Sequence, residues 1–208
     1  MGLLARLISS IPENYLSPEE YLAWEETQTV RHEYVDGQVY AMSGVSKNHG
    51  RITKNMTFQL ERHLFDSVCE PYTTDVKLAV KTHQTRYYYP DVVVTCEAGN
   101  EDPEDAYLIV QPILLVEVLS PSTKRTDKVE KFNAYQQIVG LREYIIVAQD
   151  QMRVEVYRHE KAGDVWQGQV FTEAEQEVTL QSVGLTVNLA TIYRRVIFPP
   201  PTEGEPNQ

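Results

Sequence analysis

The segment PILLVEVLS (residues 112–120) constrains the fold more than any other part of the chain. In a strand the side chains alternate between two faces, so Glu117 shares one face with Leu115 and Leu119, while leucine and valine occupy the other. Because both faces are apolar, residues 113–119 are predicted to form a central strand covered on both sides. Burying a charge without a partner is costly. Glu117 is therefore expected to meet a lysine or arginine, backbone donors, or a metal ion.

The segments around this strand predict a mixture of helices and strands. Ser17-Pro18-Glu19-Glu20 has the sequence of a capping box and predicts a helix over about 18–27. Asp36-Gly37 between alternating segments predicts a hairpin within 31–44. The remaining predicted elements are helices over 49–67 and 124–139 and strands over 76–80, 86–96, 143–149, 153–158, 165–171 and 178–182.

This order of elements predicts the fold class. A β-rich middle followed by strand, helix and strand over 113–149 indicates an α/β (α+β) fold with a central mixed β-sheet flanked by helices. The later strands are expected to add antiparallel strands at the C-terminal end. A single domain is expected over 1–198, since no repeat or linker interrupts it. The Pro-, Gly- and Glu-rich residues 199–208 predict a disordered acidic tail.

Composition limits the expected location. No apolar stretch approaches the ~20 residues that span a membrane. The first residues lack a convincing signal-peptide pattern. The two cysteines, Cys69 and Cys96, fit a reducing compartment and no metal-binding pattern. We therefore expect a cytoplasmic protein without membrane contact.

The formal net charge of −11 argues against general affinity for nucleic acid, because phosphate contacts need cationic surface. It does not exclude a nuclease, since sites for divalent cations gather carboxylates. Basic residues cluster in two segments, which are either solvated faces or the places for phosphate contacts. The clusters are Lys47, His49, Arg51 and Lys54, and Lys124, Arg125, Lys128 and Lys131.

A second carboxylate, Asp91, stands in a strand-forming run of tyrosine and valine, directly after Pro90. Because proline removes a donor from the strand ladder, an edge, a bulge or a strand opening is expected there, unless the Pro-Asp pair only marks a turn. Asp91 and Glu117 on neighbouring strands would present the oxygen ligands that Mg²⁺ prefers. The carbonyl of Val118 could add a third ligand. The alternative for Glu117 is a structural ion pair.

Lys128 and Lys131 fall within the apolar arc of the predicted helix over 124–139, at about 100° per residue. A lysine in a sheet-facing arc needs a buried partner or a route to water for its amine. Because this helix directly follows the Glu117 strand, Lys131 is expected to reach the carboxylates, with snorkelling to water as the alternative. The arc consists of Val129, Phe132, Tyr135, Ile138 and Val139.

The two acids have a recognisable spacing. Pro90-Asp91, followed 26 residues later by Glu117-Val118-Leu119, resembles the PD-(D/E)XK signature of restriction-endonuclease-like phosphodiesterases. That signature usually ends in lysine, which activates or orients water, whereas this chain has Leu119. The absence of lysine at position 119 leaves open which residue supplies the cationic group of the signature.

The wider resemblance covers about 15–195. The chain is similar there to a large bacterial family of restriction-endonuclease-like proteins, many of unknown function. In that family the lysine is thought to have migrated to the helix after the Glu strand, and Lys131 matches it. Glu33 matches a further acid. The segments that carry the resemblance are RHEYVDGQVY, SKNHGRI, YYPDVVV, LLVEVLSPSTKRTDKVEKFNAYQ and LREYIIV.

The resemblance implies a restriction-endonuclease-like core and a metal-dependent endonuclease that acts on nucleic acid, with DNA as the expected substrate. Mg²⁺ or Mn²⁺ would be held by Asp91 and Glu117 with the Val118 carbonyl, and Lys131 would orient water or stabilise the phosphate. Glu33 would be a further catalytic acid. A homodimer is expected, since cutting two strands often uses two copies. The expected nucleic-acid contacts are His49, Lys124, Arg125 and Lys128.

Two other functions stay open. The missing motif lysine and the acidic composition fit a catalytically decayed module that binds nucleic acid or protein on the same fold. An acid/base hydrolase that uses the two carboxylates without metal is the third candidate.

Overall fold

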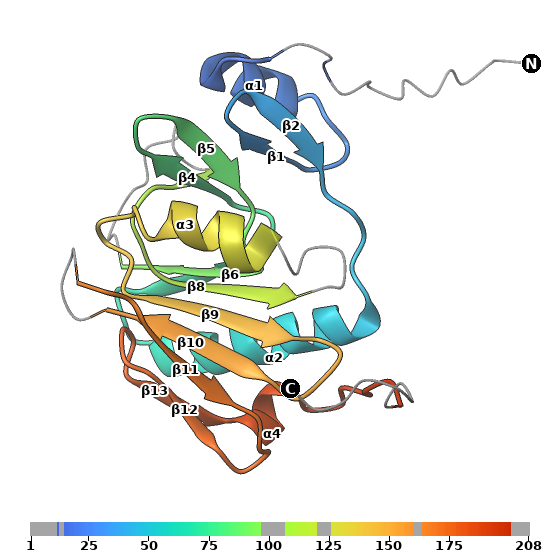
Figure 1. Cartoon of the computed structure of the whole chain (residues 1–208), viewed down its shortest axis with the longest axis vertical. Coiled ribbons are helices and arrows are strands. Elements are labelled where there is room, and N and C mark those ends of the chain that lie inside the picture. The colour runs from blue at the N-terminus through green and yellow to red at the C-terminus, as the bar shows by residue number, and fades with distance from the viewer. Residues whose placement is uncertain (1–11, 13–14, 97–106, 120–125, 160–163, 201–208) are drawn as a thin grey trace, which may run out of the picture.

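The computed structural model describes residues 12, 15–96, 107–119, 126–159 and 164–200. They form a six-stranded sheet, a five-stranded sheet, a two-stranded ribbon, one long helix and several shorter helical segments (Figure 1). The mixed class predicted from the sequence is therefore confirmed. None of the described helices is long and apolar enough to cross a membrane. The single-domain boundary stays a prediction, and tail residues 201–208 lie outside the described part.

Strand β8 (Pro112–Leu119) organises the six-stranded sheet. It pairs in parallel with β9 (Glu143–Ala148) and antiparallel with β6 (Val92–Thr95), so the sheet is mixed and β8 is central, as predicted. The strand order is β11-β10-β9-β8-β6-β3. The outer strands are β3 (Glu70–Thr73), β10 (Val154–Arg158) and β11 (Gln167–Phe171).

Both faces of β8 are covered. On one face its leucine and valine side chains share a core with helix α2 (Lys47–Leu64), which buries Ile52, Met56 and Leu60 at steps of four. The opposite face packs against Tyr135 of α3 (Phe132–Tyr135). In Figure 1 the yellow α3 and the cyan α2 lie on opposite sides of the sheet. The predicted alternation is confirmed: the α2 side holds Leu114, Val116 and Val118, and the α3 side holds Leu115 and Leu119.

The five-stranded sheet has the order β2-β1-β5-β4-β7. Its predicted hairpin is confirmed: Asp36 and Gly37 take left-handed φ values of 51° and 92° between the two strands. Arg86 donates to both carboxylate oxygens of Asp36 at 2.8 Å, which holds the turn against the neighbouring strand. The strands are β1 (His32–Val35), β2 (Gln38–Ala41), β4 (Lys77–Lys81), β5 (Thr85–Tyr88) and β7 (Leu108–Ile109).

The predicted N-terminal helix is confirmed as α1 (Pro18–Glu25). The Ser17 hydroxyl accepts the Glu20 N–H at 3.2 Å, and the Glu20 carboxylate accepts the Ser17 N–H at 2.7 Å, so the capping box forms. At the other end of the molecule the chain closes with β12 (Glu177–Leu180), β13 (Leu185–Asn188) and α4 (Leu189–Ile192). Elements β3, β7, β13 and α4 were not predicted.

The predicted strand over 86–96 is wrong in one respect, because β5 and β6 belong to different sheets. Tyr89, Pro90 and Asp91 lie between them outside either strand. Pro90 has no N–H to donate, so the ladder is interrupted where the chain leaves one sheet and enters the other. The expected strand opening is thus a junction between sheets, and it leaves Asp91 at the start of β6.

The predicted helix over 124–139 is also wrong in extent. The described part is a π-helical turn, Thr126–Lys131, followed directly by α3, which ends at Tyr135. A π-helical turn uses i→i+5 hydrogen bonds, so the spacing of an α-helix does not apply to it. Val129 and Val139 are accordingly exposed and lie outside the buried arc assigned to them.

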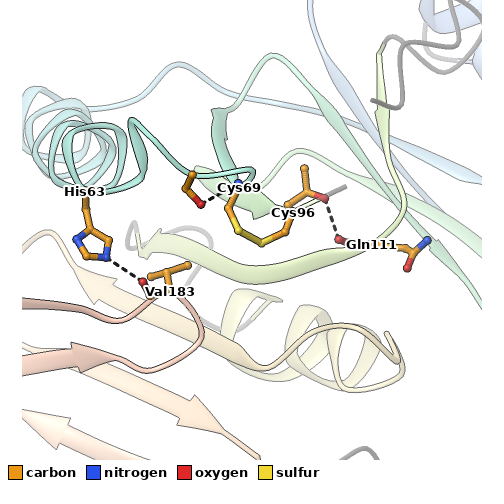
Figure 2. The surroundings of a disulfide bond; sticks show 7 residues. His63, Cys69, Cys96, Gln111 and Val183 are labelled. Atoms are coloured by element: carbon orange, nitrogen blue, oxygen red, sulfur yellow. Dashed lines mark hydrogen bonds between the residues drawn. A yellow bond between two sulfur atoms is a disulfide. The ribbon is translucent and has the colours of Figure 1, made fainter. Parts of the chain in front are cut away.

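A disulfide joins Cys69, just before β3, to Cys96, just after the paired strand β6 (Figure 2). Nearby, the Thr95 hydroxyl donates to the Gln111 carbonyl at 3.0 Å. Disulfides persist in oxidising compartments. The bond is therefore at odds with the reducing compartment that these two cysteines led us to expect.

Candidate active site

Glu117 has the partner that its burial requires. Its side chain lies on the α3 face of β8 and is only 3% exposed. Its Oε1 accepts hydrogen bonds from the Lys131 ammonium at 3.1 Å and from the Tyr135 hydroxyl at 2.8 Å. Of the partners expected for the buried Glu117 carboxylate, the structure shows a lysine.

Lys131 also joins a second acid to this group. Its Nζ lies 2.8 Å from Oε1 of Glu33, which comes from β1 of the other sheet. The π-helical turn ends at Lys131. The Lys131 side chain is buried, so its amine does not extend to water. The same Glu33 oxygen accepts the Tyr89 N–H at 3.4 Å. The ammonium thus bridges carboxylates from two sheets.

Asp91 is held from two sides. One carboxylate oxygen accepts the backbone N–H of Val118 at 2.7 Å, which fixes it against β8. The other lies 2.6 Å from Nε2 of His49, and because an ionised carboxylate only accepts, the imidazole donates. His49 stands in the first turn of α2, where the Ser46 hydroxyl accepts its N–H at 3.1 Å.

These side chains meet in one cavity of about 370 Å³ between the two sheets and the start of α2. The connection from β2 to α2, residues 42–46, forms part of its wall, and Gln149 lines it after β9. The cavity gathers six residues that the sequence singled out: Glu33, His49, Asp91, Glu117, Val118 and Lys131. The structure therefore brings these six residues together, and their roles in a functional site remain predictions.

The cavity has an excess of negative charge. Three carboxylates, Glu33, Asp91 and Glu117, share it with one ammonium, that of Lys131. Burial and the Glu117 carboxylate raise the pKa of the Tyr135 hydroxyl well above its usual range. Tyr135 therefore keeps its proton and remains a hydrogen-bond donor to Glu117.

The donor chemistry fits a divalent cation of the Mg²⁺ type, since carboxylate oxygens with surplus negative charge are its preferred ligands. Among the described residues no group of three or more His, Cys, Asp or Glu side chains is arranged to hold a metal ion. Mg²⁺ usually takes only one or two carboxylates and keeps several waters. Asp91 and Glu117 are the carboxylates that would hold such an ion, and both Asp91 oxygens already accept hydrogen bonds from the protein.

The residues predicted to contact nucleic acid do not share one environment. His49 faces Asp91. The Lys128 ammonium binds the Glu155 carboxylate on β10. Although burial alone would raise the pKa of Glu155, hydrogen bonds from Lys128, Arg153 and Tyr157 lower it below its usual value. Lys124 and Arg125 lie outside the described residues.

Sequence reasoning missed part of the site. Tyr135 was interpreted only as an apolar residue of the helix, although it lies four positions after Lys131, the spacing that puts two side chains on one helical face. The pairing of His49 with Asp91 joins residues 42 apart and has no local signal. Gln149 follows a buried strand and was not considered.

The fold and the gathered acids define the class: this is a restriction-endonuclease-like protein. Its structure matches, with a TM-score of 0.71, a crystal structure described as a putative nuclease belonging to DUF820 from Anabaena variabilis, over 88% of this chain and 99% of that one. The two sequences are 16% identical, so the likeness concerns the fold. Residues 18–191 match the family described as "Uma2: Putative restriction endonuclease", and the chain belongs to this family. The resemblance deduced from the sequence is confirmed.

Two relatives come from Synechocystis sp. and are named as uncharacterized proteins. One, slr1290, is 39% identical over 189 residues, which is 91% of this chain and 97% of the relative. The other, sll1609, is 35% identical over 149 residues, which is 72% of this chain and 82% of the relative.

Proposed function

We propose that this protein is a metal-dependent nuclease that hydrolyses phosphodiester bonds of nucleic acid, with DNA as its substrate. The observation that carries the proposal is the meeting of Asp91, Glu117, Glu33 and Lys131 in one cavity, with Lys131 bridging acids of two sheets. Membership of a family described as putative restriction endonucleases supports it.

Mg²⁺ or Mn²⁺ would be held by Asp91 and Glu117, with the Val118 carbonyl as a further oxygen ligand. A cation bound there would act as a Lewis acid on a phosphoryl oxygen and lower the pKa of a water molecule. Lys131 takes the role of the lysine that the signature lacks at Leu119. Its ammonium, fixed by Glu33 and Glu117, is positioned to stabilise negative charge that develops on the phosphate.

His49 and Tyr135 have positioning roles in this proposal. His49 donates to one oxygen of Asp91, while the Val118 N–H occupies the other, so the carboxylate has a fixed direction. The Tyr135 hydroxyl fixes Glu117 in the same way. Contact of His49 with a phosphate, as expected from the sequence, would require the imidazole to turn away from Asp91.

The hydrogen bonds of Asp91 also favour the second candidate, a binding module that has lost catalysis. Both carboxylate oxygens already accept protein donors, so a cation must compete with the His49 imidazole and the Val118 N–H. Tight binding of nucleic acid without turnover at any concentration of Mg²⁺ or Mn²⁺ would decide for this candidate.

The first prediction concerns Asp91→Asn, which keeps the shape and an acceptor for the Val118 N–H but removes a charge. We expect metal-dependent cleavage of plasmid and oligonucleotide DNA to fall by at least about 10-fold to 100-fold, because loss of a metal ligand should cost no less than loss of a residue that only supports a ligand. Asp75→Asn is the matched control, because Asp75 is exposed and pairs only on the surface with Arg31. Cleavage that survives in Asp91→Asn, or continues with EDTA present, would refute the proposal.

A homodimer remains part of the proposal, because cutting both strands of a duplex commonly uses two copies of a site. Sedimentation with and without duplex DNA tests it. The cytoplasmic location remains a prediction from composition, against which the Cys69–Cys96 disulfide stands.

A further inference from the structure

A groove of about 460 Å³ continues from the candidate active site along helix α2. It shares Val45, His49, Thr74 and Asp91 with the catalytic cavity, so the two spaces adjoin. Its volume lies in the range of pockets that hold small ligands, about 300–1,000 Å³. The rest of the wall comes from one flank of α2 and from the end of β3: Gly50, Thr53, Lys54, Thr57, Phe58, Glu61 and Thr73.

Phe58 gives this groove an aromatic surface. Its side chain is 54% exposed, although it stands on a helix whose opposite face is fully buried. An exposed aromatic ring beside an apolar groove is a surface on which an unpaired base can stack. Phe65, two turns further along, is 85% exposed and lies outside the groove.

The outward face of α2 is basic in an acidic protein. One outward stripe of the helix holds Lys47, Arg51, Lys54 and Phe58, at intervals of three or four residues. The buried stripe, which includes Ile52 and Met56, lies on the opposite side of the helix. The helix carries four Lys or Arg residues and one acid, Glu61, whereas the whole chain has a net charge of −11. The helix that begins at the cavity therefore carries an excess of the positive charge that nucleic-acid binding needs.

The carboxylates of the cavity are buried, and this limits the kind of nucleic acid that can reach them. Asp91 is 6% and Glu117 3% exposed, so a phosphate must be led down into the cavity. In a duplex the bases are stacked and paired, and their faces are not available to Phe58 without unstacking. A flexible single strand can meet both demands.

We propose that the groove beside α2 binds single-stranded nucleic acid, with an unpaired base stacked on Phe58 and a neighbouring phosphate contacted by Lys54. The inference rests on the proposed nuclease function, since the strand leads to Asp91, and it names the substrate class. The protein then acts on single-stranded, frayed or flapped nucleic acid in preference to intact duplex.

The test is binding measured by fluorescence anisotropy in EDTA, so that cleavage does not intervene. The probes are labelled single-stranded DNA of about 16 nucleotides, the single-stranded RNA of the same sequence, and the corresponding DNA duplex. We expect a single strand to bind more tightly than the duplex, and the two single-stranded probes show whether DNA or RNA is preferred. Duplex binding as tight as that of both single strands overturns the inference.

Matched variants locate the binding surface. Phe58→Ala is expected to weaken single-strand binding by about 5-fold to 100-fold, the range for loss of one base-stacking contact. Phe65→Ala, at a more exposed phenylalanine that caps the C-terminal end of the same helix, is expected to bind as the unaltered protein does. Lys54→Ala should reduce the slope of binding against salt by about one, whereas Lys81→Ala should not. Equal effects of the Phe58 and Phe65 variants, or none, overturn the inference.

Each of the two proposals can be refuted independently of the other. If DNA is cleaved in an Asp91-dependent way while Phe58→Ala binds normally, the nuclease function stands and the single-strand groove is wrong. If Phe58 is needed for binding but no cleavage occurs with Mg²⁺ or Mn²⁺, the groove stands and the nuclease function is wrong.

Discussion

At the scale of single residues, the arrangement depends on Lys131. Its buried ammonium lies between two carboxylates from different sheets, Glu117, which is nearly fully buried, and Glu33, which is partly buried. Removing one member of a buried ion pair leaves the remaining charges without compensation and typically costs about 3–5 kcal/mol. The group is therefore a structural requirement as well as a proposed catalytic one, and the two roles need separate measurements.

We predict that Lys131→Met lowers the free energy of unfolding by about 3–5 kcal/mol. Adding Glu117→Gln should recover part of this loss, because the second change removes one of the charges left behind. Urea denaturation of both single variants and the double variant gives the coupling energy. Lys81→Met, at an exposed position, is the control and should change stability by no more than about 0.5 kcal/mol. Similar losses for Lys131→Met and Lys81→Met would contradict the buried bridge.

At the scale of elements, the β1–β2 hairpin carries Glu33 to the cavity. Its turn requires left-handed backbone at Gly37, with φ of 92°. A β-carbon at Gly37 would also lie 2.5 Å from Cδ1 of Tyr15. The register of β1, and with it the position of Glu33, therefore depends on a glycine distant from the chemistry.

We predict that Gly37→Ala destabilises the protein by about 1–2 kcal/mol, from backbone strain and the contact with Tyr15. Gly184→Ala is the comparison, because Gly184 also has a positive φ, 70°, but no atom lies within 4 Å of its added β-carbon. Thermal unfolding should show the larger loss for Gly37→Ala. A smaller loss at Gly37 than at Gly184 would mean that Tyr15 moves aside freely.

Local patterns were enough to predict most elements and the pair of acids. The alternation around Glu117, the capping box at Ser17 and the Asp36-Gly37 turn are each set by neighbours in sequence, and each is confirmed. The division of 86–96 between two sheets was not predictable in this way, because β5 (TRYY) and β6 (VVVT) are both runs of strand-forming residues, and their assignment to different sheets depends on distant partners. The His49–Asp91 contact was missed for the same reason.

At the scale of the whole molecule, the Cys69–Cys96 disulfide joins positions 27 apart in the sequence and closes a loop that contains β3, β4, β5 and β6. A cross-link limits the freedom of the unfolded chain, and a loop of this length corresponds to about 3–4 kcal/mol. The segment inside the loop includes the junction that carries Asp91.

We predict that reduction with dithiothreitol lowers the urea midpoint by an amount equal to about 3–4 kcal/mol of stability. The Cys69→Ser, Cys96→Ser double variant should have the same reduced stability with or without the reductant, which makes it the control for other effects of the reagent. Titration of free thiols in the unfolded, unreduced protein provides a second check. Two free thiols, or a midpoint that does not change on reduction, would contradict the cross-link.

The cavity draws Glu33 from the five-stranded sheet, Glu117 from the six-stranded one and Asp91 from the junction between them. During synthesis or refolding, a chain that has completed only one of these sheets lacks the assembled candidate site, however native that sheet is. The proposed nuclease activity would then be among the last properties acquired on the way to the native state, and among the first lost when the sheets separate. A protein with that activity would be harmless to nucleic acid until it has finished folding.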